Sequence, residues 1–161
     1  EEQQKRKFLV KVSGGNFTEF EPGRIRFHER DFSLEILNTS REDGRLYEFS
    51  VSRGSEEEVW QVQLEVFEAV ADPSIRVLAR ALSNGSCSLA LRCGAERGDA
   101  VSYSWRSREN GTGAGICSGS GRFLNLSYSL GNSGFGCVCT AANPVSSRGI
   151  AFESSQCGPE Q

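Results

Sequence analysis

Apolar and polar residues alternate with a period of two through most of this chain. That period predicts β-strands with one buried face, and no segment has the 3.6-residue period of a helix. The first part has predicted strands at Phe8–Val12, Arg24–His28, Phe32–Leu37, Leu46–Ser52 and Val59–Phe67. The second part has predicted strands at Ile75–Arg80, Cys87–Cys93, Val101–Arg106, Phe123–Tyr128, Gly136–Ala141 and Gly149–Glu153. We therefore expect an all-β protein.

The strand Val59–Phe67 shows the alternation most clearly. Trp60 shares one face with Val62, Leu64 and Val66, while Gln61 and Gln63 face the other way. Trp60 is either a core residue or an exposed interface anchor, and its alignment with Val62 favours the core. Arg53-Gly54-Ser55 predicts a hairpin turn before this strand.

Two stretches interrupt the strand pattern. Residues 68–73 form a short joint, and Pro73 prevents a continuous hydrogen-bond ladder there. We therefore expect one domain at 1–67 and a second at 68–161. Residues 107–121 are rich in glycine and serine and predict a flexible connection.

The second part carries a cysteine and tryptophan pattern. Trp105 follows Cys93 by twelve residues, and Cys139 follows Cys93 by 46. This order and spacing are typical of strands B, C and F of an immunoglobulin domain, where the tryptophan packs on the disulfide between the sheets. The sequence therefore predicts a Cys93–Cys139 bridge.

The cysteines and the asparagines together indicate an extracellular protein. All six cysteines lie in residues 87–157, an even number that favours disulfides. A zinc site is disfavoured, because Cys137-x-Cys139 lacks the CxxC spacing and His28 is distant. N-glycosylation triplets begin at Asn16, Asn38, Asn84, Asn110 and Asn125.

Charge and composition exclude several function classes. The net charge of −3 argues against a nucleic-acid partner. The chain has no apolar run of membrane-spanning length, no methionine and no signal peptide, so we expect a part of an ectodomain. His28 has no recognisable nucleophile or acid cluster, and Glu56-Glu57-Glu58 is interpreted as a solvated turn rather than a metal site. We expect no enzyme activity and no cofactor.

The first part shows features of a variable-type immunoglobulin domain. Asp43-Gly44-Arg45-Leu46-Tyr47 resembles the corner before strand F, where the tyrosine hydroxyl bonds to the backbone. Arg24 lies nineteen residues before Asp43, a spacing at which such domains form an arginine–aspartate bridge. Phe49 stands where strand F normally has its cysteine. This domain is therefore expected to rely on apolar packing alone.

Several motifs resemble the signalling lymphocytic activation molecule family of leukocyte receptors. They are Asn84-Gly85-Ser86-Cys87-Ser88-Leu89, Cys93-Gly94-Ala95-Glu96-Arg97-Gly98-Asp99, Val101-Ser102-Tyr103-Ser104-Trp105, Cys139-Thr140-Ala141-Ala142-Asn143-Pro144-Val145-Ser146 and the closing Cys157. In the first part, Arg24-Ile25-Arg26-Phe27 through Arg41-Glu42-Asp43 aligns with the family's D–E–F region.

The resemblance implies two tandem immunoglobulin-like sandwiches. The first is a partial variable-type domain without a disulfide, with strands from about C′ to G. The second is a constant-type domain with two or three disulfides. Cys87–Cys157 is implied as the family's second bridge. Cys117 and Cys137 are an extra pair that the family does not require, so Cys117 either reaches strand F or remains a free thiol.

The resemblance also implies a function. Family members bind an identical or related receptor on an opposing cell through the sheet that contains strands F and G, which gives adhesion and co-stimulation of lymphocytes. The outward residues of these strands are the predicted partner-binding set: Glu48, Ser50, Ser52, Gln61 and Gln63. A membrane span and a tail that binds SH2 adaptors would complete a cell-surface receptor. A viral attachment protein is a further candidate partner, and a soluble or virus-captured decoy is the alternative reading.

Overall fold

We describe the structure from a computed structural model, which describes residues 5–108, 116–130 and 136–153. The chain divides into two compact units, Glu1–Val66 and Phe67–Gln161. Within the described ranges the secondary structure is strand, apart from one 3₁₀ turn, η1 (Arg41–Asp43). The protein is therefore all-β, as its alternating sequence predicts.

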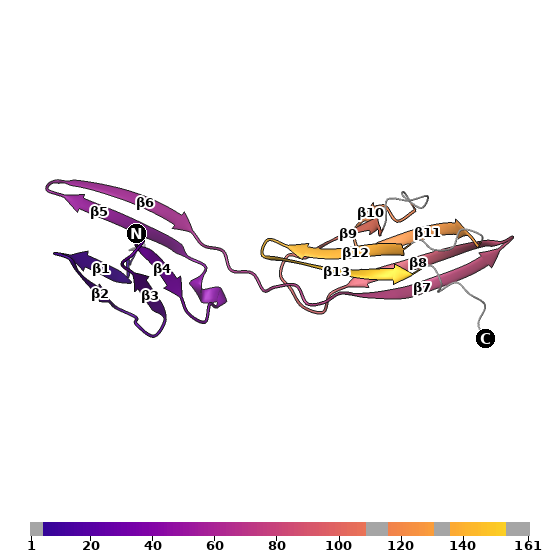
Figure 1. Ribbon diagram of the computed structural model, residues 1–161, viewed down its shortest axis with the longest axis horizontal. Coiled ribbons are helices and arrows are strands. Elements are labelled where there is room, and N and C mark those ends of the chain that lie inside the picture. The colour runs from indigo at the N-terminus through magenta and orange to yellow at the C-terminus, as the bar shows by residue number, and fades with distance from the viewer. Residues whose placement is uncertain (1–4, 109–115, 131–135, 154–161) are drawn as a thin grey trace. The chain divides into compact units, whose positions relative to one another are not determined.

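Unit 1 consists of three antiparallel hairpins (Figure 1). They pair β1 (Val10–Ser13) with β2 (Asn16–Glu19), β3 (Ile25–His28) with β4 (Ser33–Ile36), and β5 (Leu46–Arg53) with β6 (Glu56–Gln63). A two-residue turn at Gly14 and Gly15 joins the first pair, and both glycines have the positive φ that tight hairpin turns need. Among the described residues, the strands of unit 1 form only two-stranded sheets.

The core of unit 1 is small. Ile25 and Phe27 on β3 are buried, and Phe27 contacts the rings of Phe17 and Phe32 at centroid distances of 5.1 and 5.7 Å. The Phe27 amide also donates to the Glu19 carboxylate at 3.1 Å. Unit 1 is therefore the partial variable-type domain of the prediction, with no disulfide and few buried residues.

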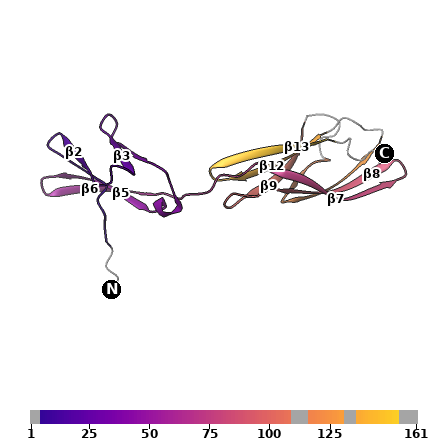
Figure 2. The same ribbon diagram turned by 90° about the horizontal axis from the view of Figure 1, so that it is seen from below.

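Unit 2 is a two-layer sandwich. One sheet has the strand order β10 (Gly119–Ser120), β9 (Ser102–Ser107), β12 (Gly136–Asn143) and β13 (Ser146–Glu153). The other sheet has the order β11 (Phe123–Ser129), β8 (Ser86–Gly94) and β7 (Ser74–Ser83). The view in Figure 2 shows β12 and β13 in one layer and β7 and β8 in the other.

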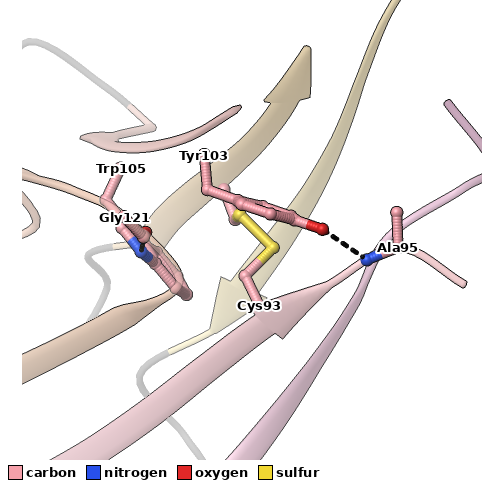
Figure 3. Close-up of a disulfide and its surroundings, with 6 residues drawn as sticks. Cys93, Ala95, Tyr103, Trp105 and Gly121 are labelled. Carbon is pink, nitrogen blue, oxygen red and sulfur yellow. Dashed lines mark hydrogen bonds between the residues drawn. A yellow bond between two sulfur atoms is a disulfide. The ribbon is translucent and has the colours of Figure 1, made fainter. Parts of the chain in front are cut away.

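The disulfide Cys93–Cys139 links the two sheets at the centre of this sandwich. Cys139 stands opposite Trp105 in the β12–β9 ladder, and Trp105 is 4% exposed. The Trp105 indole donates to the Gly121 carbonyl at 3.1 Å, and the Tyr103 hydroxyl accepts from the Ala95 amide at 3.1 Å. Figure 3 shows these contacts around the bridge. The predicted immunoglobulin arrangement is confirmed.

A second disulfide joins Cys117 to Cys137, and both residues are fully buried. The alternative of a free Cys117 thiol is therefore excluded, and the described residues include no free cysteine. Cys87 is fully buried on β8. Its predicted partner, Cys157, lies outside the described residues, so the Cys87–Cys157 bridge stays a prediction.

The structure corrects several expectations. Trp60 is 49% exposed rather than in the core, because no layer of described residues covers that face of β6 completely. Glu56–Glu58 begin β6 instead of forming a turn, and β6 ends at Gln63 because its pairing with β5 ends at Leu46. Within the predicted flexible stretch, Gly119–Ser120 form β10 on β9. β2 was not predicted.

Candidate partner-binding face

A hydrogen-bonded corner fixes the start of β5. Arg24 forms two bonds to the Asp43 carboxylate, at 2.7 and 2.8 Å, and one to the Asn38 carbonyl at 2.6 Å. The Tyr47 hydroxyl donates to the Asp43 carbonyl at 2.8 Å. The predicted arginine–aspartate bridge and the predicted tyrosine corner are both confirmed. Together they determine which face of β5 points outward.

The contacts of this corner shift the pKa values of Asp43 and Tyr47 in opposite directions. The Ser40 amide and then Arg24 hydrogen-bond the Asp43 carboxylate, and these bonds lower the pKa of that carboxyl. Burial, and next the Asp43 charge, raise the pKa of the Tyr47 hydroxyl. Asp43 is therefore ionised and Tyr47 is neutral at neutral pH, the protonation states that this corner needs.

The outward face of the β5–β6 hairpin is polar and exposed. Glu48 stands directly opposite Gln61, and Leu46 stands opposite Gln63. Ser50 and Ser52 follow on β5 at alternate positions, which places them on the same face. The structure thus brings all five predicted binding residues together on one exposed face: Glu48, Ser50, Ser52, Gln61 and Gln63.

Two apolar residues on this face were missed from the sequence. The hairpin register places Leu46 beside Gln63 and Val59 beside Ser50, and these side chains are 56% and 46% exposed. Simple alternation along β5 and β6 would have found both, because each lies two positions from a predicted residue. The face therefore combines polar groups with a small apolar component.

The opposite face of the hairpin is aromatic. Phe49 stands directly opposite Trp60, with ring centroids 5.5 Å apart, and Val62 stands opposite Tyr47. Phe49 and Trp60 are 51% and 49% exposed. This face carries the residue types of a sandwich core and is only half covered within the described residues.

One ion pair touches the predicted face. Arg6 lies 3.3 Å from the Glu48 carboxylate, and the Arg6 side chain is largely exposed. The pair contributes about 0–1 kcal/mol to stability, because the loss of side-chain entropy offsets most of the electrostatic attraction between two solvated groups. Glu48 therefore remains available to exchange this partner for another cation.

The asparagines of the predicted glycosylation sites lie on the surface. Asn16, Asn38, Asn84 and Asn125 are all exposed, and Asn110 lies outside the described residues. Asn38 and Asn84 adopt positive φ, as turn asparagines do. Each of the four described positions has the solvent access that glycosylation requires, and glycosylation itself stays a prediction.

The described residues offer no metal centre to set beside this face. They contain no group of three or more histidine, cysteine, aspartate or glutamate side chains that could hold a metal. His28 forms a solvent-exposed pair with Glu35 at 2.9 Å, on β3 and β4. Within the same residues, no helix has the length and hydropathy of a membrane span.

Comparison with known proteins identifies relatives in one group. The chain is 36% identical over 148 residues to the signaling lymphocytic activation molecule of Canis lupus familiaris, which covers 91% of this chain. It is 35% identical to the Mus musculus protein of the same name, and this match covers 89% of the present chain. These similarities fit the signalling lymphocytic activation molecule family. No protein-family model matches it.

More distant relatives agree with this family. SLAM family member 7 of Homo sapiens is 26% identical over 76% of this chain, and the T-lymphocyte surface antigen Ly-9 of Homo sapiens is 30% identical over 78%. The chain spans 43% and 42% of the length of the canine and murine relatives. By its name, Ly-9 is a T-lymphocyte surface antigen.

A solved structure supports the fold independently. The CD2-binding domain of CD58 (lymphocyte function-associated antigen 3) matches 89% of this chain with a TM-score of 0.52 and 21% identity, over 76% of its own length. At this identity the match concerns the fold alone, and it is an immunoglobulin-type fold.

Proposed function

We propose that this chain is the extracellular part of a lymphocyte cell-surface receptor that binds an identical or related immunoglobulin-family receptor on an opposing cell. The observation that carries the proposal is the exposed face of the β5–β6 hairpin, where Glu48 and Gln61 stand directly opposite each other. Similarity to the signaling lymphocytic activation molecule and to the T-lymphocyte surface antigen Ly-9 supports it.

The composition of the face suits a weak and reversible contact. Polar groups such as Gln61 and Gln63 must lose water when a partner binds, and this cost offsets much of what their new hydrogen bonds contribute. Leu46 and Val59 add a small apolar area that favours association. Adhesion between cells uses many such contacts at once, so a low affinity per molecule is sufficient.

The signalling part of the proposal rests on the similarity to the signaling lymphocytic activation molecule. A membrane span would anchor the receptor, and tyrosine motifs in its cytoplasmic tail would bind SH2 adaptors after contact between cells. These elements supply co-stimulation, while the β5–β6 face supplies recognition. The two parts are separable in experiment, because only recognition depends on Glu48 and Gln61.

The test is aggregation of cells that display the chain on their surface. Cells with the unaltered chain should aggregate with each other, and the double variant Glu48→Lys, Gln61→Arg should lose aggregation, because two new cations disrupt the face. The matched control is Ser104→Arg, which adds a cation to the exposed face of β9 in unit 2. Equal aggregation of the double variant and the unaltered chain would contradict the proposed face. Failure of the unaltered chain to aggregate would contradict homophilic binding.

A further inference from the structure

The segment between β6 and β7 is held differently at its two ends. In unit 1, the Leu64 amide donates to the Arg45 carbonyl at 3.0 Å. In unit 2, the Glu68 amide donates to the Asp99 carboxylate at 2.8 Å, and the Asp99 amide donates back to the Glu68 carbonyl at 3.2 Å. Glu68 is therefore part of the hydrogen-bonded framework of unit 2, although it precedes β7 by several residues.

Asn143, at the end of β12, completes this attachment. Its side-chain nitrogen donates to the Glu68 carbonyl at 2.7 Å and to the Asp99 carbonyl at 2.9 Å. Its side-chain oxygen accepts from the Ser146 amide at 2.9 Å and from the Ser146 hydroxyl at 2.8 Å. It also accepts from the Val145 amide at 3.2 Å. One amide group thus joins the β12–β13 turn, the 95–101 loop and the incoming chain.

The next residues of the incoming chain are also fixed. The Val70 amide donates to the Ser146 hydroxyl at 2.8 Å, and the Ala71 amide donates to the Arg97 carbonyl at 2.9 Å. Val70 is 3% exposed and belongs to the core of unit 2. Gly98 lies against it with a φ of +136°, and a Cβ at that position would meet the Val70 Cα at 3.1 Å. Only glycine combines this backbone conformation with this contact.

The three residues between these attachments are free of such bonds. Among the described residues, the backbones of Glu65, Val66 and Phe67 take part in no hydrogen bond. We propose that Asn143 is a latch that fixes residues 68–71 to unit 2, so that movement of the connecting segment is confined to Glu65–Phe67. The inference does not depend on the proposed function.

Amide hydrogen exchange, followed residue by residue by NMR on the whole chain, tests the latch. In Asn143→Ala, we expect the amides of Glu68, Val70 and Ala71 to exchange about tenfold faster or more, the effect of losing one hydrogen bond. In Ser146→Ala, the Val70 amide should lose most protection. Ser102→Ala removes a neighbouring hydroxyl that donates to the Ala142 carbonyl, and it should leave all three amides protected.

Amides inside β8 and β12 serve as the internal control, because local release of the latch leaves them unchanged. Unchanged exchange at Glu68, Val70 and Ala71 in Asn143→Ala would refute the latch. A loss spread evenly over β8 and β12 in both Asn143→Ala and Ser146→Ala would also refute it, because these contacts would then serve general stability. In the unaltered chain, NMR backbone relaxation should show more nanosecond motion at residues 65–67 than at residues 68–71. Equal motion in the two segments would contradict the proposal that movement is confined to Glu65–Phe67.

Discussion

Phe49 and Trp60 stand opposite each other on the β5–β6 hairpin with their ring centroids 5.5 Å apart, and about half of each side chain is exposed. In a variable-type domain, Phe49 occupies the position of the strand F cysteine. The aromatic pair is a contact between neighbouring strands of one hairpin, whereas an immunoglobulin disulfide links the two facing sheets.

The two tryptophans should differ in what their loss costs. Trp60→Ala should remove the contact with the Phe49 ring, which contributes about 0.5–1.5 kcal/mol to the stability of unit 1. The loss of buried apolar area adds to this cost, and that addition is limited because the Trp60 ring is half exposed. Trp105→Ala should destabilise unit 2 by about 3–5 kcal/mol, since it leaves a cavity beside the Cys93–Cys139 bridge. Chemical denaturation of each variant measures both, with Val62→Ala as the control for an exposed apolar residue. Equal losses for the two tryptophans would contradict the assigned environments.

Removal of the disulfides should follow the lengths of the loops that they close. Cys93–Cys139 spans 46 residues and Cys117–Cys137 spans 20. Replacing both cysteines of a pair by alanine should cost about 4 kcal/mol for the first and about 3 kcal/mol for the second. Thermal unfolding of the two double variants measures the difference. A larger loss for the Cys117–Cys137 pair would show that its role exceeds loop closure.

The corner at Asp43 should make unit 1 sensitive to acid. Because the pKa of Asp43 is lowered in the folded state, its contribution to stability is present above the unfolded value of about 3.9 and is lost as pH falls through the folded value. Asp43→Asn should therefore be less stable than the unaltered chain at pH 7, and this difference should shrink below about pH 4. The indole NMR signal of Trp60 reports on unit 1 alone. A difference that is constant from pH 7 to pH 3 would contradict this assignment.

Glycosylation should occur at the exposed asparagines. When the chain is secreted from mammalian cells, we expect glycans at Asn16, Asn38, Asn84 and Asn125, each of which is accessible. Asn110, which lies outside the described residues, is predicted by its triplet alone. Enzymatic release of the glycans followed by mass spectrometry of each peptide measures occupancy, and the matching Asn→Gln variants are the controls. An unmodified Asn125 would indicate that a position in the middle of a strand is a poor acceptor.

The sequence predicts most of the strands because alternation and special residues act locally. The spacing of Cys93, Trp105 and Cys139 specifies strands that must face each other, and the structure contains that arrangement. Arg24 and Asp43 could be paired from their spacing alone, because the corner that joins them has a fixed geometry.

Other features depend on neighbours that a linear pattern does not contain. Alternation assigned Trp60 to the correct face of β6, but whether that face is covered depends on other strands. The two residues of β10 are too few to show a period. Six cysteines allow fifteen pairings, so the Cys117–Cys137 bridge required the three-dimensional placement of Cys117.

The position of Cys137 two residues before Cys139 has a practical consequence for biochemical work. Trypsin cuts after lysine and arginine, and residues 123–148 contain neither until Arg148, so both cysteines remain in one peptide. The peptides that carry Cys93 and Cys117 both attach to it, and exchange of their partners leaves the total mass unchanged. A tryptic disulfide map therefore cannot distinguish the native protein from an isomer with these two bridges exchanged. Quality control of any preparation needs cleavage or fragmentation at Val138.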